Sequence, residues 1–244
     1  MSEFTNKKAV VTGATRGIGR AIADSLLSRG CRVYGIYGGN HEAAEEFQSH
    51  WDRSLLTLAC CDVADHDRVR QTFEEIENRF DSLDILINNA GIRKDAIVAL
   101  MNSEQWQQVL DINLTGTFNT TRYAVPLMMK QKYGRIVAIT SPSAQMGIQG
   151  QANYAASKAG QVGFIRTLAK EVARKKITAN CVSPGFIATE LIDDLSEDQL
   201  KAYKKMVPMR RFGTVDEVVD GVLFLASEKA AYITGTTLEI TGGL

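Results

Sequence analysis

A tyrosine and a lysine four residues apart are the pair best suited to chemistry in this chain. Tyr154 and Lys158 stand in the run Y-A-A-S-K, near the start of a helix-forming segment of small residues. Residues at i and i+4 of a helix share one face, so the two side chains are expected to lie together. A neighbouring ammonium favours the phenolate and lowers the tyrosine pKa from its usual value of about 10. Such a tyrosine gives its proton to the oxygen of a carbonyl group whose carbon receives hydride, and regains one at neutral pH.

Two polar residues elsewhere strengthen this interpretation, because a Tyr-x-x-x-Lys pair by itself is usually an exposed ring beside a solvated lysine. Ser141 ends a predicted strand thirteen residues before Tyr154, where its hydroxyl would reach the same substrate oxygen. Asn113 is a short polar residue inside a predicted helix, a position that its side chain disfavours. Its apolar neighbours Ile112 and Leu114 indicate a packed segment rather than a helix surface.

A glycine-rich turn follows the first predicted strand and leads straight into a helix. The run T-G-A-T-R-G-I-G (12–19) places backbone N–H groups and a helix N-terminus where they would hold a pyrophosphate. Its order of glycines also suits a tight turn and close packing of helix on strand. The Lys-Ser/Thr ending of a nucleotide-hydrolysing P-loop is absent. The turn therefore predicts a dinucleotide site with contacts at Gly13, Thr15, Arg16, Gly17, Ile18 and Gly19.

The end of the second predicted strand indicates which dinucleotide binds. An acidic residue there accepts the ribose hydroxyls of NAD and repels a 2′-phosphate. Here the strand ends in G-I-Y-G-G-N (35–40), with no carboxylate before Glu42. Arg16 in the glycine turn carries planar donors suited to a phosphate, although a solvated surface arginine is the alternative. These features favour NADP(H) over NAD(H).

These motifs must be positioned by alternating strands and helices. Short β-branched runs alternate with segments of helical periodicity, which predicts parallel βαβ units with helices on both faces of the sheet. The expected fold is a single Rossmann-type, doubly wound α/β domain over residues 1–244 with a seven-stranded parallel sheet. The predicted strands are Lys8–Thr12, Arg32–Tyr37, Leu55–Cys60, Asp84–Asn88, Gly134–Thr140, Ile177–Val182 and Thr237–Ile240. The predicted helices include Ile18–Arg29, Arg68–Phe80, Glu104–Lys132, Ala152–Lys175 and Val215–Ser227.

Composition excludes several classes of protein. The 244 residues carry 28 basic and 28 acidic side chains, whereas a general nucleic-acid or anionic-membrane binder would be strongly basic. Neither a membrane span nor an export signal is recognisable, so we expect a cytoplasmic protein. Its four cysteines would be free thiols, and its three histidines, all in polar stretches, predict no metal site.

Together these motifs resemble the short-chain dehydrogenase/reductase family in its NADP-type branch. The resemblance runs from Thr12 to Gly243 and includes D-V (62–63), N-N-A-G (88–91), P-G (184–185) and T-G-G (241–243). It implies that Asn113, Ser141, Tyr154 and Lys158 are catalytic, with Asn113 anchoring a water that returns protons to Tyr154. It implies further nucleotide contacts at Asp62, Val63, Asn89, Ala90, Gly91, Tyr154, Lys158, Pro184, Gly185, Ile187 and Thr189.

Within that family the chain is most similar to 3-oxoacyl-[acyl-carrier-protein] reductases. N-N-A-G-I-R-K-D (88–95) and S-P-G-F-I-A-T-E (183–190) carry this narrower match, whereas the run Ser141–Met146 departs from it. The implied reaction is NADPH-dependent reduction of a carrier-bound 3-oxoacyl thioester in fatty-acid or related biosynthesis. A polyketide ketoreductase, an acetoacetyl-CoA reductase and, from another class, a non-catalytic nucleotide-binding module are the alternatives.

The resemblance also implies a homotetramer and an acidic acyl carrier protein as partner. The tetramer implied by the resemblance is built on the segment after Ala152, whose small residues would let a second helix approach, and on the segment Glu104–Lys132. Basic residues cluster at Lys130, Lys132 and Arg135, and again at Arg174, Lys175 and Lys176. We expect Lys132 and Lys175 to contribute to carrier docking, although cations at solvated helix ends are the alternative.

Overall fold

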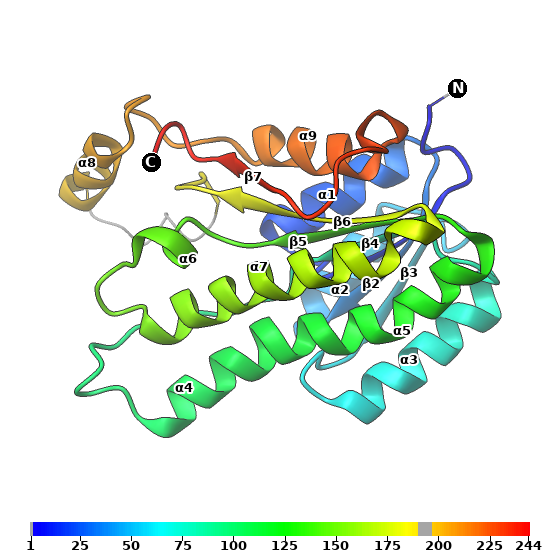
Figure 1. Cartoon of the computed structure of the whole chain (residues 1–244), viewed down its shortest axis with the longest axis horizontal. Helices are drawn as coiled ribbons and strands as arrows, with labels where there is room; N and C mark the ends of the chain where they lie inside the picture. The colour runs from blue at the N-terminus through cyan, green and yellow to red at the C-terminus, as the bar shows by residue number, and fades with distance from the viewer. Residues whose placement is uncertain (1, 190–196) are drawn as a thin grey trace.

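The computed structural model describes residues 2–189 and 197–244. Seven parallel strands form one sheet in the order β3-β2-β1-β4-β5-β6-β7 (Figure 1). This arrangement confirms the predicted Rossmann-type α/β fold. The strands are β1 (Lys8–Thr12), β2 (Arg32–Tyr37), β3 (Leu56–Cys60), β4 (Ile85–Asn88), β5 (Gly134–Ile139), β6 (Ile177–Pro184) and β7 (Thr237–Ile240).

Helices cover both faces of the sheet, as the apolar character of the strands requires. Every residue of β4, β5 and β6 is buried, so these strands present apolar side chains to two separate layers. One face packs against α1 (Gly17–Ser28), α2 (His41–Ser49) and α9 (Val215–Ala226). The other packs against α3 (His66–Phe80), α5 (Gly116–Gln131) and α7 (Ala152–Val172). Figure 1 shows α1 and α9 on one side of the sheet and α3, α5 and α7 on the other.

The long helix predicted over Glu104–Lys132 is divided into three parts. It consists of α4 (Ser103–Leu110), a π-helical turn (Asp111–Thr115) and α5. Asn113 lies in this turn, and its carbonyl accepts hydrogen bonds from Thr117 Oγ1 at 2.7 Å and Gln161 Nε2 at 2.8 Å. A π turn of this kind often marks a functional site, because it turns one residue out of the regular ladder.

The structure also contains short helices outside the predicted ranges. They include α2, α6 (Ser143–Met146) and α8 (Glu197–Met206). Asn40 caps the first turn of α2 by accepting from Ala43 N at 3.0 Å. The predicted helix Ala152–Lys175 ends at Val172, where a 3₁₀ turn (Ala173–Lys175) replaces it; another 3₁₀ turn spans Glu228–Ala230.

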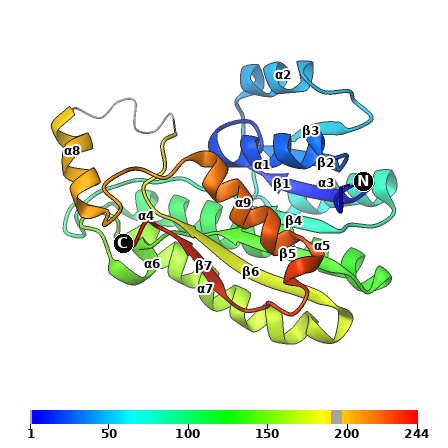
Figure 2. The same ribbon diagram turned by 90° about the horizontal axis from the view of Figure 1, so that it is seen from above.

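The direction of the strands decides where a ligand can bind. β1 lies between β2 and β4, so the chain order reverses at β1, and a crevice is expected at the carboxyl ends of the strands there. Figure 2 shows α6, α8 and the C-terminus gathered at this edge, away from the N-terminus. Within the described residues, no helix is both long and apolar enough to cross a membrane.

Candidate functional site

The glycine turn after β1 is locked to the loop after β4. Asn89 N and Ala90 N donate to Thr12 Oγ1 at 3.0 and 2.9 Å. Gly13 has a φ of 66°, and a Cβ there would stand 2.8 Å from Asn89 Nδ2. A Cβ on Gly19 would collide with the carbonyl of Gly13. These two positions therefore require glycine for close packing between β1, α1 and β4.

The first turn of α1 is left open to an anion. No side chain caps it and no acidic residue lies in it, whereas α2, α3, α4 and α9 all have side-chain caps. Gly17 has a φ of 53°, and a Cβ there would meet no heavy atom within 4 Å. Thr15 is buried and Arg16 is exposed beside this turn, while Ile18 is half-buried. Free N–H groups, a helix dipole and open space fit a dinucleotide pyrophosphate.

The end of β2 carries no carboxylate, as predicted. A Cβ added to Gly38 or to Gly39 would meet no heavy atom within 4 Å, so this end of the strand is open. Across the edge, Asp62 is exposed and Val63 is buried at 5% exposure. Asn119 Nδ2 donates to the carbonyl of Val63 at 2.9 Å, so this loop after β3 is fixed from α5.

Ser141, Tyr154 and Lys158 meet at the carboxyl end of β5. The hydroxyl of Ser141 acts on the side chain of Tyr154 and lowers its pKa, so the two side chains are neighbours. Lys158 Nζ lies 5.5 Å from the centroid of the Tyr154 ring and donates to the carbonyl of Ile139 at 2.8 Å. Ser141 Oγ also accepts from the Ser143 hydroxyl at 3.1 Å, which orients it from α6. The fold thus brings together three side chains that the sequence singled out.

The pKa of Tyr154 differs from the predicted one because of the surroundings of its side chain. Burial raises the pKa of this phenol above its ordinary value, although the hydroxyl of Ser141 and the charge of Arg93 act in the opposite direction. Lys158 is not among the groups that lower it, and burial destabilises the ammonium of Lys158 and lowers the pKa of Lys158 to about 8. The lysine is therefore a destabilised cation whose proton is easily released.

Asn113 joins this group through the backbone. Its Oδ1 accepts from Ile92 N at 2.8 Å, and its Nδ2 donates to Ile92 O at 3.1 Å and Ser157 Oγ at 3.0 Å. Ser157 Oγ in turn donates to the carbonyl of Tyr154 at 2.7 Å. A Cβ on Gly91 would lie 3.3 Å from Asn113 Oδ1 and 3.6 Å from Lys158 Nζ, so this glycine packs closely against both side chains. The sequence prediction missed Ser157, although it lies within Y-A-A-S-K.

The loop after β6 completes the edge. Pro184 ends β6, and Gly185 N donates to the carbonyl of Ile240 at 2.9 Å. A Cβ on Gly185 would lie 2.9 Å from Thr241 Cα, so the closing T-G-G run packs on this glycine. Ile187 is buried and forms a bridge with Gly213. Thr189 is half-exposed, and Glu190, the last residue of the S-P-G-F-I-A-T-E motif, lies outside the described residues.

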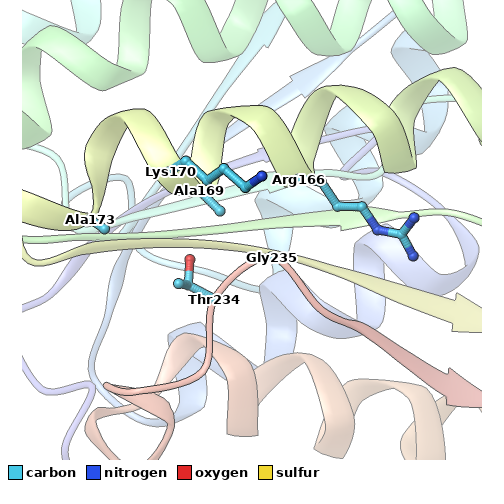
Figure 3. Close-up of a pocket in the computed structure, with 6 residues that line it drawn as sticks. All are labelled: Arg166, Ala169, Lys170, Ala173, Thr234 and Gly235. Atoms are coloured by element: carbon cyan, nitrogen blue, oxygen red, sulfur yellow. The ribbon is translucent and has the colours of Figure 1, made fainter.

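The basic clusters lie at the opposite edge of the sheet. Lys132 caps the C-terminus of α5 just before β5, and Lys175 lies in the turn just before β6. A groove of about 400 Å³ beside them, between α7 and the loop before β7, carries Arg166 and Lys170 (Figure 3). Because β5 has six residues at about 3.3 Å each, roughly 20 Å of strand separates this edge from Ser141.

The prediction that Arg135 belongs to an exposed basic cluster is wrong. Arg135 is 2% exposed, because its guanidinium donates to Glu228 Oε2 at 3.0 Å and to the carbonyls of Ser227 and Lys176 at 3.2 Å. It stabilises the amino-terminal edge of β5 instead of facing a partner. Lys130 forms an ion pair with Glu77, which further reduces the free positive charge at this end of α5.

Comparison with known proteins places this site in a family. Residues 13–244 match the family model described as enoyl-(acyl carrier protein) reductase, adh_short_C2. The chain belongs to this short-chain dehydrogenase/reductase family of nucleotide-dependent oxidoreductases.

Individual relatives align over almost the whole chain. The 3-oxoacyl-[acyl-carrier-protein] reductase FabG of Staphylococcus epidermidis is 42% identical, covering 98% of this chain and 99% of the relative. FabG of Escherichia coli K12 is 42% identical, covering 99% and 98% respectively. Nodulation protein G of a Rhizobium species is 43% identical and covers 100% and 99%.

Proposed function

We propose that this chain reduces a 3-oxoacyl thioester, carried on acyl carrier protein, to the 3-hydroxyacyl thioester with NADPH. The observation that carries this proposal is the grouping of Ser141, Tyr154 and the buried Lys158 at the strand edge where parallel sheets bind ligands. Relatives named as 3-oxoacyl-[acyl-carrier-protein] reductases at 42% identity support the substrate class.

The residues of this site have distinct parts in the reaction. The Ser141 hydroxyl holds the 3-oxo oxygen, and the Tyr154 hydroxyl gives that oxygen its proton as the carbonyl carbon is reduced. The thioester bond stays intact, and one proton returns from water to Tyr154 in each turnover. Lys158, with an easily released proton, favours this return, and Asn113 holds Lys158's neighbours in place and anchors a water on the path to solvent.

The cofactor in this proposal is NADP(H), which when bound supplies the hydride. The uncapped turn with Gly17 and Ile18 would hold its pyrophosphate, and Arg16 its 2′-phosphate. Asp62 and Val63 would border the adenine. Asn89, Ala90 and Gly91 would line the cleft, and Pro184, Gly185, Ile187 and Thr189 would border the nicotinamide end.

The test follows NADPH absorbance with acetoacetyl-CoA and with a 3-oxoacyl group on carrier protein. Tyr154→Phe keeps the ring and removes the acid, so turnover should fall by about 10²–10⁴-fold while NADPH still binds. Crotonyl-CoA is the control for the enoyl reduction that the description of the family model suggests. Oxidation of NADPH with crotonyl-CoA but not with either 3-oxoacyl substrate contradicts the proposal. A turnover of Tyr154→Phe within tenfold of the parent also contradicts it.

We also propose a cytoplasmic homotetramer in which α4, α5 and α7 meet their copies. Trp106, Phe118 and Met129 expose 39%, 43% and 38% of their surface on α4 and α5. On α7, Gly163 would let a partner approach, since a Cβ there meets nothing within 4 Å, whereas Gly160 is needed within the chain because a Cβ would lie 2.8 Å from Leu114.

This assembly gives the distant basic edge a function. Pairing about a two-fold axis perpendicular to these helices makes equivalent helices antiparallel, so the Lys132 end of α5 in one chain would lie near the α4 end in the other. α4 packs on the start of α7 through Asn153, whose amide donates to the carbonyl of Gln105 at 3.0 Å. We therefore propose that Lys132 and Lys175 dock an acidic carrier protein for the site of a neighbouring subunit.

A further inference from the structure

Asn153, the residue before Tyr154, connects three separate elements. It is 0% exposed, and its Nδ2 donates to Lys94 O at 2.9 Å and to Gln105 O at 3.0 Å. Its Oδ1 accepts the backbone N–H of Tyr154 at 2.7 Å. One side chain therefore ties the loop after β4 and helix α4 to the first turn of α7. Since the start of α7 has no side-chain cap, this acceptor also satisfies an N–H group that would otherwise be buried without a partner.

The loop after β4 is attached to the start of α7 at further points along residues 92–96, here called the strap. Gln151 Nε2 donates to Asp95 Oδ2 at 3.1 Å. Ala96 N donates to the carbonyl of Gly150 at 2.8 Å. The first residue of the strap is held by the asparagine of the π turn, as described above. The strap is thus fixed at both ends, and Asn153 holds its middle.

The strap carries two charged side chains that act on Tyr154 through their electric field. Arg93 donates to Asp95 through Nη2 at 2.5 Å and Nε at 3.3 Å. The charge of Arg93 lowers the pKa of Tyr154 and that of Asp95 raises it, with Arg93 the larger influence. Within residues 2–189 and 197–244, the other charged or titratable groups in this neighbourhood are Lys158 on α7, 5.5 Å from the centroid of the Tyr154 ring, and Tyr203 on α8, which interacts with Arg93.

We propose that Asn153 is a positioning residue, which fixes the strap so that the Arg93–Asp95 pair stays within electrostatic range of Tyr154. The proposal rests on the proposed role of Tyr154 as the proton donor. Breaking the tether lets the strap move away, and the net positive influence of the pair on the phenol weakens. The phenolate is then less favoured. Oxidation of a 3-hydroxyacyl thioester, which begins from the phenolate, must therefore shift to higher pH.

The experiment measures kcat/KM for oxidation of 3-hydroxybutyryl-CoA with NADP⁺ as a function of pH. Asn153→Ser keeps an acceptor for the Tyr154 N–H and loses both donors, so it is expected to fold. The rising limb of the pH profile of this variant should move to higher pH by about half a unit, which is the size expected for one partly screened charge. Gln151→Leu breaks a second attachment of the strap and should move the limb in the same direction. It keeps the test decisive if Asn153→Ser does not fold.

A double-mutant cycle separates positioning from simple loss of stability. Arg93→Ala should shift the limb in the parent, but it should add little in Asn153→Ser, because there the arginine has already moved away. The matched control is Asn180→Ser, which removes another fully buried amide that donates to Ile233 O at 2.8 Å and accepts from Thr236 N at 3.2 Å. It should lower thermal stability without moving the limb.

Two results overturn the proposal. One is a pH profile of Asn153→Ser and Gln151→Leu that coincides with that of Asn180→Ser. The other is an effect of Arg93→Ala that is equal in both backgrounds. An active Tyr154→Phe variant would instead refute the proposed proton donor, so failure of this inference and failure of the proposed function are told apart.

Discussion

We expect the buried ammonium of Lys158 to destabilise the folded protein. This destabilisation should change with pH, so it can be measured. Burial lowers the pKa of Lys158 from 10.5 to about 8, a difference worth about 3 kcal/mol at 1.36 kcal/mol per unit. At neutral pH this full cost is present, since both states carry the proton. Lys158→Met removes the charge but leaves the carbonyl of Ile139 without its donor, at a cost of about 1–3 kcal/mol. We therefore expect the inactive variant to be at least as stable as the parent at pH 7.

The sharper expectation concerns how this difference changes with pH. The folded chain releases the proton near pH 8, while the unfolded chain keeps it up to about pH 10.5, so raising the pH in this window stabilises the parent. The neighbouring thiol of Cys181 stays neutral there, because burial raises its pKa to about 12. Between about pH 7 and about pH 9.5 the parent should gain about 2 kcal/mol relative to Lys158→Met.

Urea unfolding of the nucleotide-free protein at these two pH values, followed by tryptophan fluorescence, measures the gain. Lys170→Met removes an exposed ammonium from the same helix and is the matched control, which should follow the parent at both pH values. The assignment of a destabilised cation would be refuted by either of two results. One is a difference in unfolding free energy between the parent and Lys158→Met that stays constant with pH, and the other is a difference that grows with pH in favour of the variant.

Three further outcomes test the nucleotide, the assembly and the partner. Arg16→Ala should weaken NADPH binding by about ten- to a hundredfold, because one charge-assisted contact is lost, and should leave NADH binding unchanged. If fluorescence titration shows equal weakening for both nucleotides, Arg16 does not bind the 2′-phosphate. Light scattering at micromolar concentration should give four times the chain mass of 26.8 kDa, and a monomer contradicts the tetramer. Lys132→Glu combined with Lys175→Glu should reduce activity and its salt dependence on carrier-bound substrate while sparing acetoacetyl-CoA. Equal loss on both substrates would point to damage to the fold or assembly.

The sequence by itself determined the strands, the glycine turn and the grouping of Ser141, Tyr154 and Lys158. β1, β2 and β7 have the predicted bounds, and the other strands differ from them by at most two residues at an end. These features are local: β-branched runs buried on two faces, glycine required by a tight turn, and an i, i+4 pair on one helix face. The position of Ser141 could also be predicted, because a residue that follows a parallel strand always lies at the carboxyl edge of the sheet.

Only the tertiary structure decided which polar residues support that trio and what their charges do. Asn153 reaches the carbonyl of Lys94 across 59 residues of chain, and Arg135 reaches Glu228 across 93. No periodic pattern in the sequence indicates such contacts. Asn153 was therefore predicted only as part of a helix, and Arg135 as a surface cation. The pKa of Lys158 likewise depends on elements that surround it from every side. Periodicity reports the neighbours within a few residues, whereas burial and electrostatic partners are set by segments that meet only when the sheet and its helices have packed.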